Sequence, residues 1–532
     1  MTNRKFLLFL AAYGCLLLLP AYWLPLTEST EGRYAEIARE MLVSGNYLEP
    51  ALNGIYHFHK PPFAYWAMAV GMKLFGVNGF GVRFFGIVAA LLTVLVVQKT
   101  SRLVLQDEEE SRGAGVLLAS SMLFIALSRG VSTDIYLACS VSGALYFLFR
   151  QIYGTRSSLN AYAYALCLGA GFLIKGPVIF LFTLLPHLLA KRFDPRQRKV
   201  FTPREILTAT LLFMAVALPW YLAVIDLHPQ LFFYFTKTQT VDRVATEKFG
   251  RDKPFWYFFV LFPVTFFPWI LTFVKGALRY KELEGKLRAL YLYLLVPLVV
   301  FSCAKSKLPT YILPFYGTAA IIAVETWRRF GSSRVNRGIL VGLLLFPIAL
   351  PVAGFIIPAL KPLRLSLAIA GIILFAAWYW LSRLAGDERF RNAVAGYLIG
   401  MSVIVFLVGA QPGVLGSGYM HLADSLNRLD SQRTVKTVIF RDFLPSLSFY
   451  RGELVHVAGK SRDTRFQADD SFRRWYLETD DDLRRAIAGD SRLFMVSRPA
   501  HLKDFEELTG FACSELERSG RIAAYDCLPA KP

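Results

Sequence analysis

Carboxylates and basic side chains stand beside the apolar segments of this sequence, where together they could act on a charged substrate. Glu31 and Arg33 open the helical pattern Thr30–Met41, and Asp134 begins a later apolar segment. Carboxylates can remove a proton or stabilise a developing positive charge, whereas arginine and lysine bind phosphate. A purely structural explanation also exists, because an acidic residue at a helix start interacts favourably with the helix dipole.

Four more short polar segments beside the apolar runs contain basic residues, and we call all of these segments polar islands. Lys60 follows His59 and precedes a Pro-Pro pair, and Lys175 interrupts an apolar run. A lysine in such a break is costly unless it is paired or hydrated, although one beside a proline at an interface can simply extend its ammonium group to water. The other two islands contain Arg243, in the segment 227–254, and Lys305 with Lys307 and Tyr311.

The composition decides the class of protein. The 532 residues are 55% hydrophobic and 18% charged, whereas an ordinary soluble domain has about 25% charged residues. The apolar residues come in runs such as Phe6–Leu24, which contains no charge, and roughly 20 such residues cross a bilayer. The net charge of +20 comes mainly from short clusters between these runs, which favours membrane lipids over nucleic acid as partners.

We predict an α-helical polytopic membrane protein with about thirteen spans. The apolar stretch 62–77 is short and follows Pro61-Pro62, so it is expected to be an interfacial or re-entrant helix. The predicted spans are 6–24, 82–104, 113–130, 133–150, 160–174, 177–190, 206–226, 255–275, 287–304, 309–325, 338–357, 364–382 and 392–410.

Basic clusters between the spans predict the orientation. If 62–77 does not cross, the clusters at 191–205, 275–288, 328–337 and 383–391 share one side, which the positive-inside rule makes cytoplasmic. The polar islands then all fall on the opposite face. Each could be a hydrated helix end, but together they predict a cationic pocket with two carboxylates that suits a lipid phosphate.

The chain changes character after the membrane domain, which is expected to comprise residues 1–410. Glycine and proline punctuate 411–418 like a linker. Runs of strand length at 435–440, 454–457 and 493–496, with a helix at 481–488, predict a small α/β domain over residues 411–532. The expected orientation places this domain in the periplasm.

Cys513 and Cys527 flank Ser519-Gly520 in what the sequence predicts to be a hairpin. In an oxidising compartment such thiols tend to pair, and a hairpin can bring two positions within the distance that a disulfide spans. We therefore predict a disulfide, with two buried free thiols as the alternative.

The order of these motifs resembles the bacterial aminoarabinose transferases of lipid A, which belong to the protein-mannosyltransferase-like group with the GT-C fold. The similarity extends over about 400 residues of the membrane part. It is carried by Glu31-Gly32-Arg33-Tyr34-Ala35-Glu36-Ile37-Ala38-Arg39-Glu40-Met41, His59-Lys60-Pro61, Asp134, Lys175-Gly176 and Lys307-Leu308-Pro309-Thr310-Tyr311-Ile312-Leu313-Pro314.

The resemblance implies transfer of a sugar from undecaprenyl phosphate to a lipid acceptor on the periplasmic side of the bacterial inner membrane. Glu31 and Asp134 would be the site carboxylates. The residues that would bind the donor phosphate or line its cavity are Arg33, Tyr34, Lys60, Lys175, Arg243, Lys305, Lys307 and Tyr311.

The chain departs from the family at three positions. Many relatives have Asp-Glu where this chain has Thr30-Glu31, and the lipid A enzymes usually have Glu and His where it has His59 and Thr240. The last two positions can hold a metal in the family, so His59 is the candidate ligand for a divalent metal.

The resemblance implies 4-amino-4-deoxy-L-arabinose as the sugar and lipid A as the acceptor, and we expect a monomeric enzyme. The alternative within the same chemistry is another polyprenyl-phosphate sugar with another acceptor, such as a lipopolysaccharide core sugar or a protein hydroxyl. A polyprenyl-lipid transporter is disfavoured, because transporters place their ionisable groups near the bilayer midplane and often have repeated halves.

Overall fold

A computed structural model describes residues 2–28, 30–242, 252–387, 389–409, 419–460, 466–467 and 470–530. The chain divides into two compact units. The first contains residues 1–19 and 86–408, and the second contains residues 20–85 and 409–532. The predicted linker at 411–418 lies outside the described residues.

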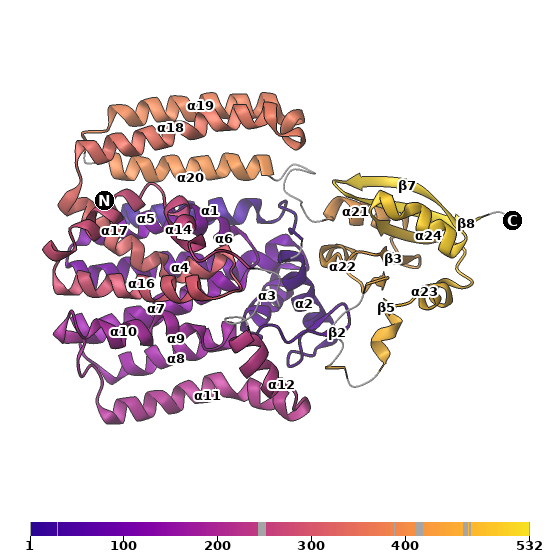
Figure 1. The fold of residues 1–532 in the computed structure, drawn as a ribbon, viewed down its shortest axis with the longest axis horizontal. Helices are drawn as coiled ribbons and strands as arrows, with labels where there is room; N and C mark the ends of the chain where they lie inside the picture. Colours follow the sequence, from indigo (N-terminus) through magenta and orange to yellow (C-terminus); the bar gives the residue numbers. More distant parts are fainter. Residues whose placement is uncertain are drawn as a thin grey trace. The chain divides into compact units, whose positions relative to one another are not determined.

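The first unit is a helical bundle, coloured indigo to orange in Figure 1. Its helices are α1 (Asn3–Leu18), most of α4 (Gly79–Leu105), α5 (Glu108–Ala119), α6 (Met122–Arg129), α7 (Thr133–Tyr153), α8 (Ser158–Lys175), α9 (Val178–Phe182), α10 (Leu184–Ala190), α11 (Pro203–Leu227), α12 (Leu231–Phe233), α14 (Tyr257–Thr265), α15 (Ile270–Leu278), α16 (Gly285–Cys303), α17 (Tyr316–Phe330), α18 (Ser333–Ile356), α19 (Arg364–Arg383) and α20 (Phe390–Gly409).

Within the described residues, eight helices are long and apolar enough to cross a membrane, and the bent pair α5–α6 makes nine. The other four predicted spans correspond to α8, α9 with α10, α14 with α15, and the 3-10 segment Pro309–Phe315 with α17. These do not meet the same criterion, so the count of thirteen stays a prediction. The stretch 62–77 forms the short helix α3 (Phe63–Phe75), whose length of roughly 20 Å is less than the hydrocarbon thickness.

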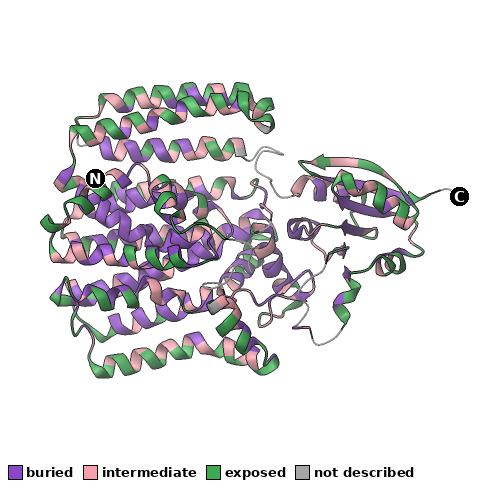
Figure 2. Ribbon diagram, viewed as in Figure 1, coloured by how far each residue is buried: buried purple, intermediate pink, exposed green. Residues whose placement is uncertain are grey.

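The outer helices of the bundle are apolar on their exposed sides. Only 17% of the most apolar part of α11 and 28% of that of α18 are buried, whereas 67% of that of α7 is buried. Figure 2 shows α7 largely purple and the two outer helices largely green. Residues such as Leu207, Leu345 and Ile372 are large, apolar and exposed, as a surface facing lipid requires.

The second unit combines the first loop of the chain with the C-terminal residues. The loop supplies α2 (Glu31–Ser44), the two-residue strands β1 (Ala51–Leu52) and β2 (Ile55–Tyr56), α3 and the start of α4. The C-terminal part supplies α21 (Met420–Leu429), β3 (Lys436–Phe440), α22 (Pro445–Arg451), β4 (His456–Ala458), β5 (Tyr476–Leu477), α23 (Asp480–Ile487), β6 (Leu493–Ser497), α24 (Leu502–Thr509), β7 (Phe511–Ser519) and β8 (Ile522–Pro529).

The C-terminal strands form one six-stranded sheet in the order β5-β4-β3-β6-β8-β7. Strands β3, β4, β5 and β6 pair in parallel, whereas β8 is antiparallel to both β6 and β7. Both faces of β3 and β6 are buried, which explains why these strands are continuous apolar runs in the sequence. The predicted α/β character and the predicted strands are confirmed.

The first loop packs on the C-terminal part through specific contacts (Figure 1). The backbone N–H of Leu26 donates to the Tyr450 hydroxyl at 2.7 Å, and the Asn53 side chain donates to the Val455 carbonyl at 2.9 Å. Gly32 lies against α22 so closely that an added Cβ would be 2.8 Å from Ser446. The loop and the sheet are therefore one folded unit.

The predicted disulfide is confirmed. Cys513 of β7 and Cys527 of β8 are directly opposite each other in the ladder and are bonded, with their Cα atoms 4.1 Å apart. Cys527 is fully buried. The bond therefore joins the last two strands of the sheet at their outer ends.

Changing both Cys513 and Cys527 to Ser is expected to lower the free energy of unfolding of the second unit by up to about 3 kcal/mol, because the open chain regains loop entropy. Thermal unfolding of the wild type with and without reductant measures the same effect. Changing the exposed thiols Cys15 and Cys303 to Ser is the control. Wild-type protein whose unfolding does not respond to reductant would contradict this expectation.

Candidate functional site

Glu31 begins α2, and its carboxylate is held by three donors. Oε2 accepts hydrogen bonds from the backbone N–H of Thr27 at 2.8 Å, from its hydroxyl at 3.0 Å, and from Arg83 Nη2 at 3.4 Å. Thr30, at the N-cap position, makes no side-chain hydrogen bond to the helix. The Glu31 carboxylate is therefore fixed in one orientation, and only 13% of its side chain is exposed.

Arg83 is a site residue that sequence reasoning missed. It lies in the part of α4 that belongs to the second unit, is 3% exposed, and donates to the carbonyls of Ala21, Leu24 and Pro25 as well as to Glu31. The Arg83 guanidinium thus binds the backbone before α2 and orients the Glu31 carboxylate. The available signal was a single arginine near the start of an otherwise apolar helix.

The other predicted site residues of the first loop also belong to the second unit. The Arg33 guanidinium lies 5.5 Å from the centre of the Tyr34 ring, and Tyr34 packs against Tyr65 with ring centres 5.8 Å apart. Lys60 is half-buried. His59 packs against His57 with ring centres 3.9 Å apart. Tyrosine and histidine rings therefore lie next to the basic side chains of this loop.

Asp134, Lys175 and Tyr311, which the sequence places in separate polar islands, meet in the first unit. Ser132 caps α7 by accepting from the backbone N–H of Asp134 at 3.0 Å, and its hydroxyl donates to Oδ2 of the same residue at 3.1 Å. Lys175, at the end of α8, donates to Oδ1. The ammonium lies 4.6 Å from the centre of the Tyr311 ring. Both charged side chains are about 90% buried, so this is a desolvated ion pair rather than a hydrated helix end.

Lys307 has a structural role that the sequence did not predict. Its buried ammonium donates to the carbonyl of Lys253 at 2.8 Å and to that of Ala304. Burial lowers its pKa, opposed by Asp252. Lys307 therefore holds the segment around Lys253 against the end of α16, while Lys305 is exposed.

Two predicted features of the site involve residues near 240. Arg243 lies outside the described residues. Thr240, which stands where relatives have His, donates its hydroxyl to the Phe235 carbonyl at 2.8 Å. The described residues contain no group of three or more His, Cys, Asp or Glu side chains able to hold a metal. A threonine hydroxyl is a poorer ligand for a divalent transition metal than the imidazole that the resemblance implies at this position, so no step is assigned to a metal.

Buried charges along α2 are the second feature that sequence reasoning missed. The predicted helix is present, but its polar side is also buried. Arg39 forms a bidentate pair with Glu36 and donates to the Gly452 carbonyl at 3.2 Å. Glu40 accepts from the backbone N–H groups of Asn53 and Gly54. Burial and the neighbouring Glu36 raise the pKa of Glu40 to about 8.

Glu28 links the loop before α2 to α22. Its Oε1 accepts from the backbone N–H of Ser446 at 2.9 Å, at the start of that helix. Burial raises the pKa of Glu28 to about 7, although the hydrogen bonds to Ser446 and the charge of Arg33 oppose the shift. The protonated carboxyl is therefore the form that the folded unit prefers at acidic pH.

The second unit is expected to lose stability as the pH rises, because burial of Glu28 disfavours its charged form. Because the folded pKa of about 7 exceeds the ordinary 4.5, the stabilisation is complete below about pH 4.5 and is lost as the pH passes 7. Hydrogen exchange of α22 amides between pH 5 and 8, corrected for intrinsic rates, should show falling protection. Glu28→Gln should flatten this dependence, and Glu478→Gln, at an exposed position, should not. The same slope in wild type and Glu28→Gln would contradict the assignment.

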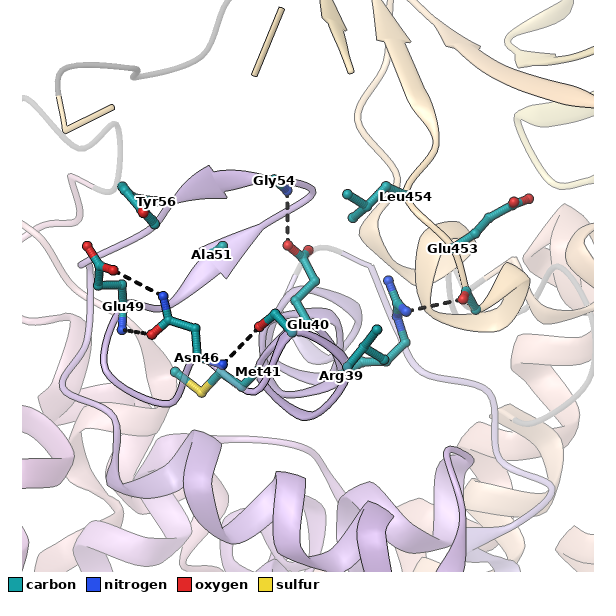
Figure 3. Close-up of a pocket in the computed structure, with 13 residues that line it drawn as sticks. Arg39, Glu40, Met41, Asn46, Glu49, Ala51, Gly54, Tyr56, Glu453 and Leu454 are labelled. Atoms are coloured by element: carbon teal, nitrogen blue, oxygen red, sulfur yellow. Dashed lines mark hydrogen bonds between the residues drawn. The ribbon is translucent and has the colours of Figure 1, made fainter. Parts of the chain in front are cut away.

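A cavity of about 370 Å³ opens beside the second half of α2. Figure 3 shows Glu40 reaching Gly54, Asn46 bonded to Glu49, and Arg39 directed toward the segment that carries Glu453. These polar groups bond to the protein itself, and none of the predicted site residues lines the cavity. It is therefore described as a feature of the second unit and not as the candidate site.

The chain matches a protein family and several named relatives. Residues 59–222 match the family model described as dolichyl-phosphate-mannose-protein mannosyltransferase. A relative from Edwardsiella ictaluri, named undecaprenyl phosphate-alpha-4-amino-4-deoxy-L-arabinose arabinosyl transferase, is 29% identical over 71% of this chain and 72% of its own length. A protein of the same name from Aeromonas salmonicida is 30% identical over 74% of this chain and 75% of its own length.

The structure resembles the crystal structure of ArnT from Cupriavidus metallidurans bound to undecaprenyl phosphate. The TM-score is 0.84, and the alignment covers the whole of both chains at 20% sequence identity. At that identity the likeness shows a shared fold. The GT-C fold expected from the sequence is confirmed, together with the sheet domain at the C-terminus.

Proposed function

We propose a function from one premise: this chain belongs to the family of the undecaprenyl phosphate-α-4-amino-4-deoxy-L-arabinose arabinosyl transferases. It is a multi-pass membrane glycosyltransferase that uses a polyprenyl-phosphate sugar donor. The proposed reaction moves 4-amino-4-deoxy-L-arabinose from undecaprenyl phosphate to lipid A. The observation that carries this proposal is the similarity over 424 residues at 30% identity, with the charged motifs in the same order.

The chemistry explains why the chain needs so many cations. The bond between the sugar C1 and the carrier phosphate oxygen breaks, the electron pair leaves with undecaprenyl phosphate, and an acceptor oxygen forms the new bond to C1. We assign Arg33, Lys60, Lys175 and Arg243 to the departing phosphate, because cations stabilise charge that develops on a leaving group. Arginine can bind two phosphate oxygens at once, whereas lysine acts as a point charge.

The two carboxylates have roles that depend on the acceptor. If the acceptor oxygen belongs to a hydroxyl group, Glu31 removes its proton. If it belongs to a phosphate of lipid A, the nucleophile is already ionised, and Glu31 stabilises positive charge on the sugar instead. Asp134 holds Lys175 in place through the buried ion pair. We propose Glu31 as the principal group in either case, with Asp134 supporting it.

The proposed location is the periplasmic face of the bacterial inner membrane, and the proposed assembly is a monomer. Basic clusters that share one side of the predicted topology support this orientation. The Cys513–Cys527 bond supports a periplasmic second unit, since disulfides persist in oxidising compartments.

Mass spectrometry of lipid A from cells with and without the protein tests the reaction. Added 4-amino-4-deoxy-L-arabinose that depends on the protein is the expected result. The changed residues Thr30, His59 and Thr240 keep a second candidate open, in which the same chemistry uses another polyprenyl-phosphate sugar and another acceptor, such as a core sugar or a protein hydroxyl. Unmodified lipid A combined with purified protein that still releases sugar from the carrier would favour that candidate.

Lys60→Ala and Arg243→Ala are each expected to weaken binding of the polyprenyl-phosphate donor by roughly 1.5–3 kcal/mol, the range for hydrogen bonds to charged groups. Titration of purified protein with undecaprenyl phosphate measures the change. Lys73→Ala, at an exposed position in the last turn of α3, is the matched control. Unchanged affinity in both variants would mean that these cations only anchor the chain to the membrane.

A further inference from the structure

Arg129 is a buried charge that the proposed reaction does not use. It is the last residue of α6 and is 3% exposed. Its guanidinium carbon lies 4.2 Å from the centre of the Phe406 ring on α20. Its Nε is buried without a hydrogen-bond partner, and among the described residues no carboxylate acts on its charge.

Tyr13 of α1 is the polar neighbour of Arg129. The phenol is 2% exposed, lies beside Ser128 and Arg129, and its hydroxyl has no hydrogen-bond partner among the described residues. The Ser128 hydroxyl donates to the Phe124 carbonyl at 2.6 Å, and its oxygen is the acceptor beside the phenol. Among the described residues, no carboxylate acts on either Arg129 or Tyr13.

An arginine in these surroundings needs an anion. Arginine stays protonated at every physiological pH, so Arg129 cannot avoid the cost of burial by losing its charge. Its position in the last turn of α6 and its contact with the Phe406 ring are both favourable, but each is weak beside the cost of a charge within a membrane segment. Charged residues in such segments usually pair or mark a binding site.

The three helices around this cluster determine which anion can reach it. Arg129, Tyr13 and Phe406 all lie near the C-terminal ends of their helices, which the predicted topology places on the outer side of the membrane. Helices α1 and α20 are each only 28% buried in their most apolar parts, so both face lipid. The anion available there is the phosphate of a membrane lipid, and basic pockets between membrane helices bind such head groups.

We propose that Arg129 and Tyr13 form a binding site for a lipid phosphate between α1, α6 and α20. The site is additional to the Asp134–Lys175 pair and does not depend on the proposed sugar transfer. Arg129 supplies a bidentate donor for two phosphate oxygens, and the Tyr13 hydroxyl donates to a third. The Phe406 ring lies against one face of the guanidinium.

Thermal unfolding of the purified full-length protein, titrated with defined lipids, tests this proposal. Undecaprenyl phosphate, lipid A and phosphatidylglycerol are the phosphate-bearing probes, and diacylglycerol is the probe without phosphate. At least one phosphate-bearing lipid should stabilise the wild type with an apparent affinity roughly tenfold or more above that for Arg129→Met. The phosphate-bearing lipid whose apparent affinity falls in Arg129→Met identifies the occupant as the donor carrier, the glycolipid or a bulk lipid.

Two further variants separate binding from folding. Arg129→Met should be at least as stable as the wild type without lipid, because it removes an uncompensated charge, and Phe406→Ala should keep or increase the response to the same lipid. Arg150→Gln, at an exposed arginine of α7, is the control. Equal lipid responses in wild type and Arg129→Met would overturn the proposal, as would a response of the wild type to diacylglycerol that matches its response to the phosphate-bearing lipids.

Discussion

Glu31→Gln is expected to lower the turnover number by about 10²–10⁴-fold, the range for a positioned acid–base group. The substitution keeps the shape of the side chain and can still accept hydrogen bonds from Thr27 and Arg83. It removes only the negative charge and the ability to take up a proton. Release of sugar from undecaprenyl phosphate by purified protein measures the effect.

The structural role of Glu31 must be separated from its chemical role. Thr27→Ala removes one of the hydrogen bonds to the Glu31 carboxylate but leaves its charge, so it should retain most activity. Glu282→Gln removes a carboxylate of an exposed ion pair and should have no effect. Near-normal activity of Glu31→Gln would mean that the carboxylate acts only as an acidic residue at the start of a helix.

Asp134→Asn is expected to damage both stability and activity, because it leaves Lys175 buried without its partner. Removing one member of a buried ion pair typically costs 3–5 kcal/mol, roughly the cost of leaving the other charge uncompensated. The cap of α7 is kept, because Ser132 still accepts from the backbone N–H of residue 134 and the Asn side-chain oxygen can accept from the Ser132 hydroxyl. The loss should therefore be traced to the charge and measured as a lower unfolding temperature together with slower sugar release.

The double variant Asp134→Asn/Lys175→Met distinguishes the two effects. It removes both charges, so the stability should return toward that of the wild type. The activity should not return, because the cation assigned to the phosphate is gone. Recovery of both stability and activity in the double variant would show that the pair serves only to pack α7 against α8.

Local patterns in the sequence were sufficient for most of the architecture. Apolar runs predicted the helices of the bundle because a segment that lies in lipid must consist mostly of apolar residues. Runs of strand length predicted β3, β4 and β6 because both faces of these strands are buried. Pairing of Cys513 with Cys527 followed from compartment and hairpin spacing. Short or broken helices such as α9 and α14 leave the span count open, because length alone no longer identifies a crossing.

The site was predicted less completely, for reasons of sequence distance. The pair Asp134–Lys175 joins two helices and was expected only as two separate polar islands. Arg83 lies 52 residues from Glu31, and no local pattern connects them. The burial of Glu36, Arg39 and Glu40 depends on a partner more than 400 residues away, so the pattern of α2 alone does not predict it.

That long separation has a consequence for how the protein is made. Ser446 follows Glu28 by 418 residues, so at about 5–20 residues per second it leaves the ribosome roughly 20–80 s later. During that interval the charged residues of α2 have been synthesised, but the C-terminal segment against which they become buried has not. A chain that stops early keeps every motif of the first loop, yet cannot complete the unit that holds Glu31. Translation to the end of the message is thus a condition for the complete second unit.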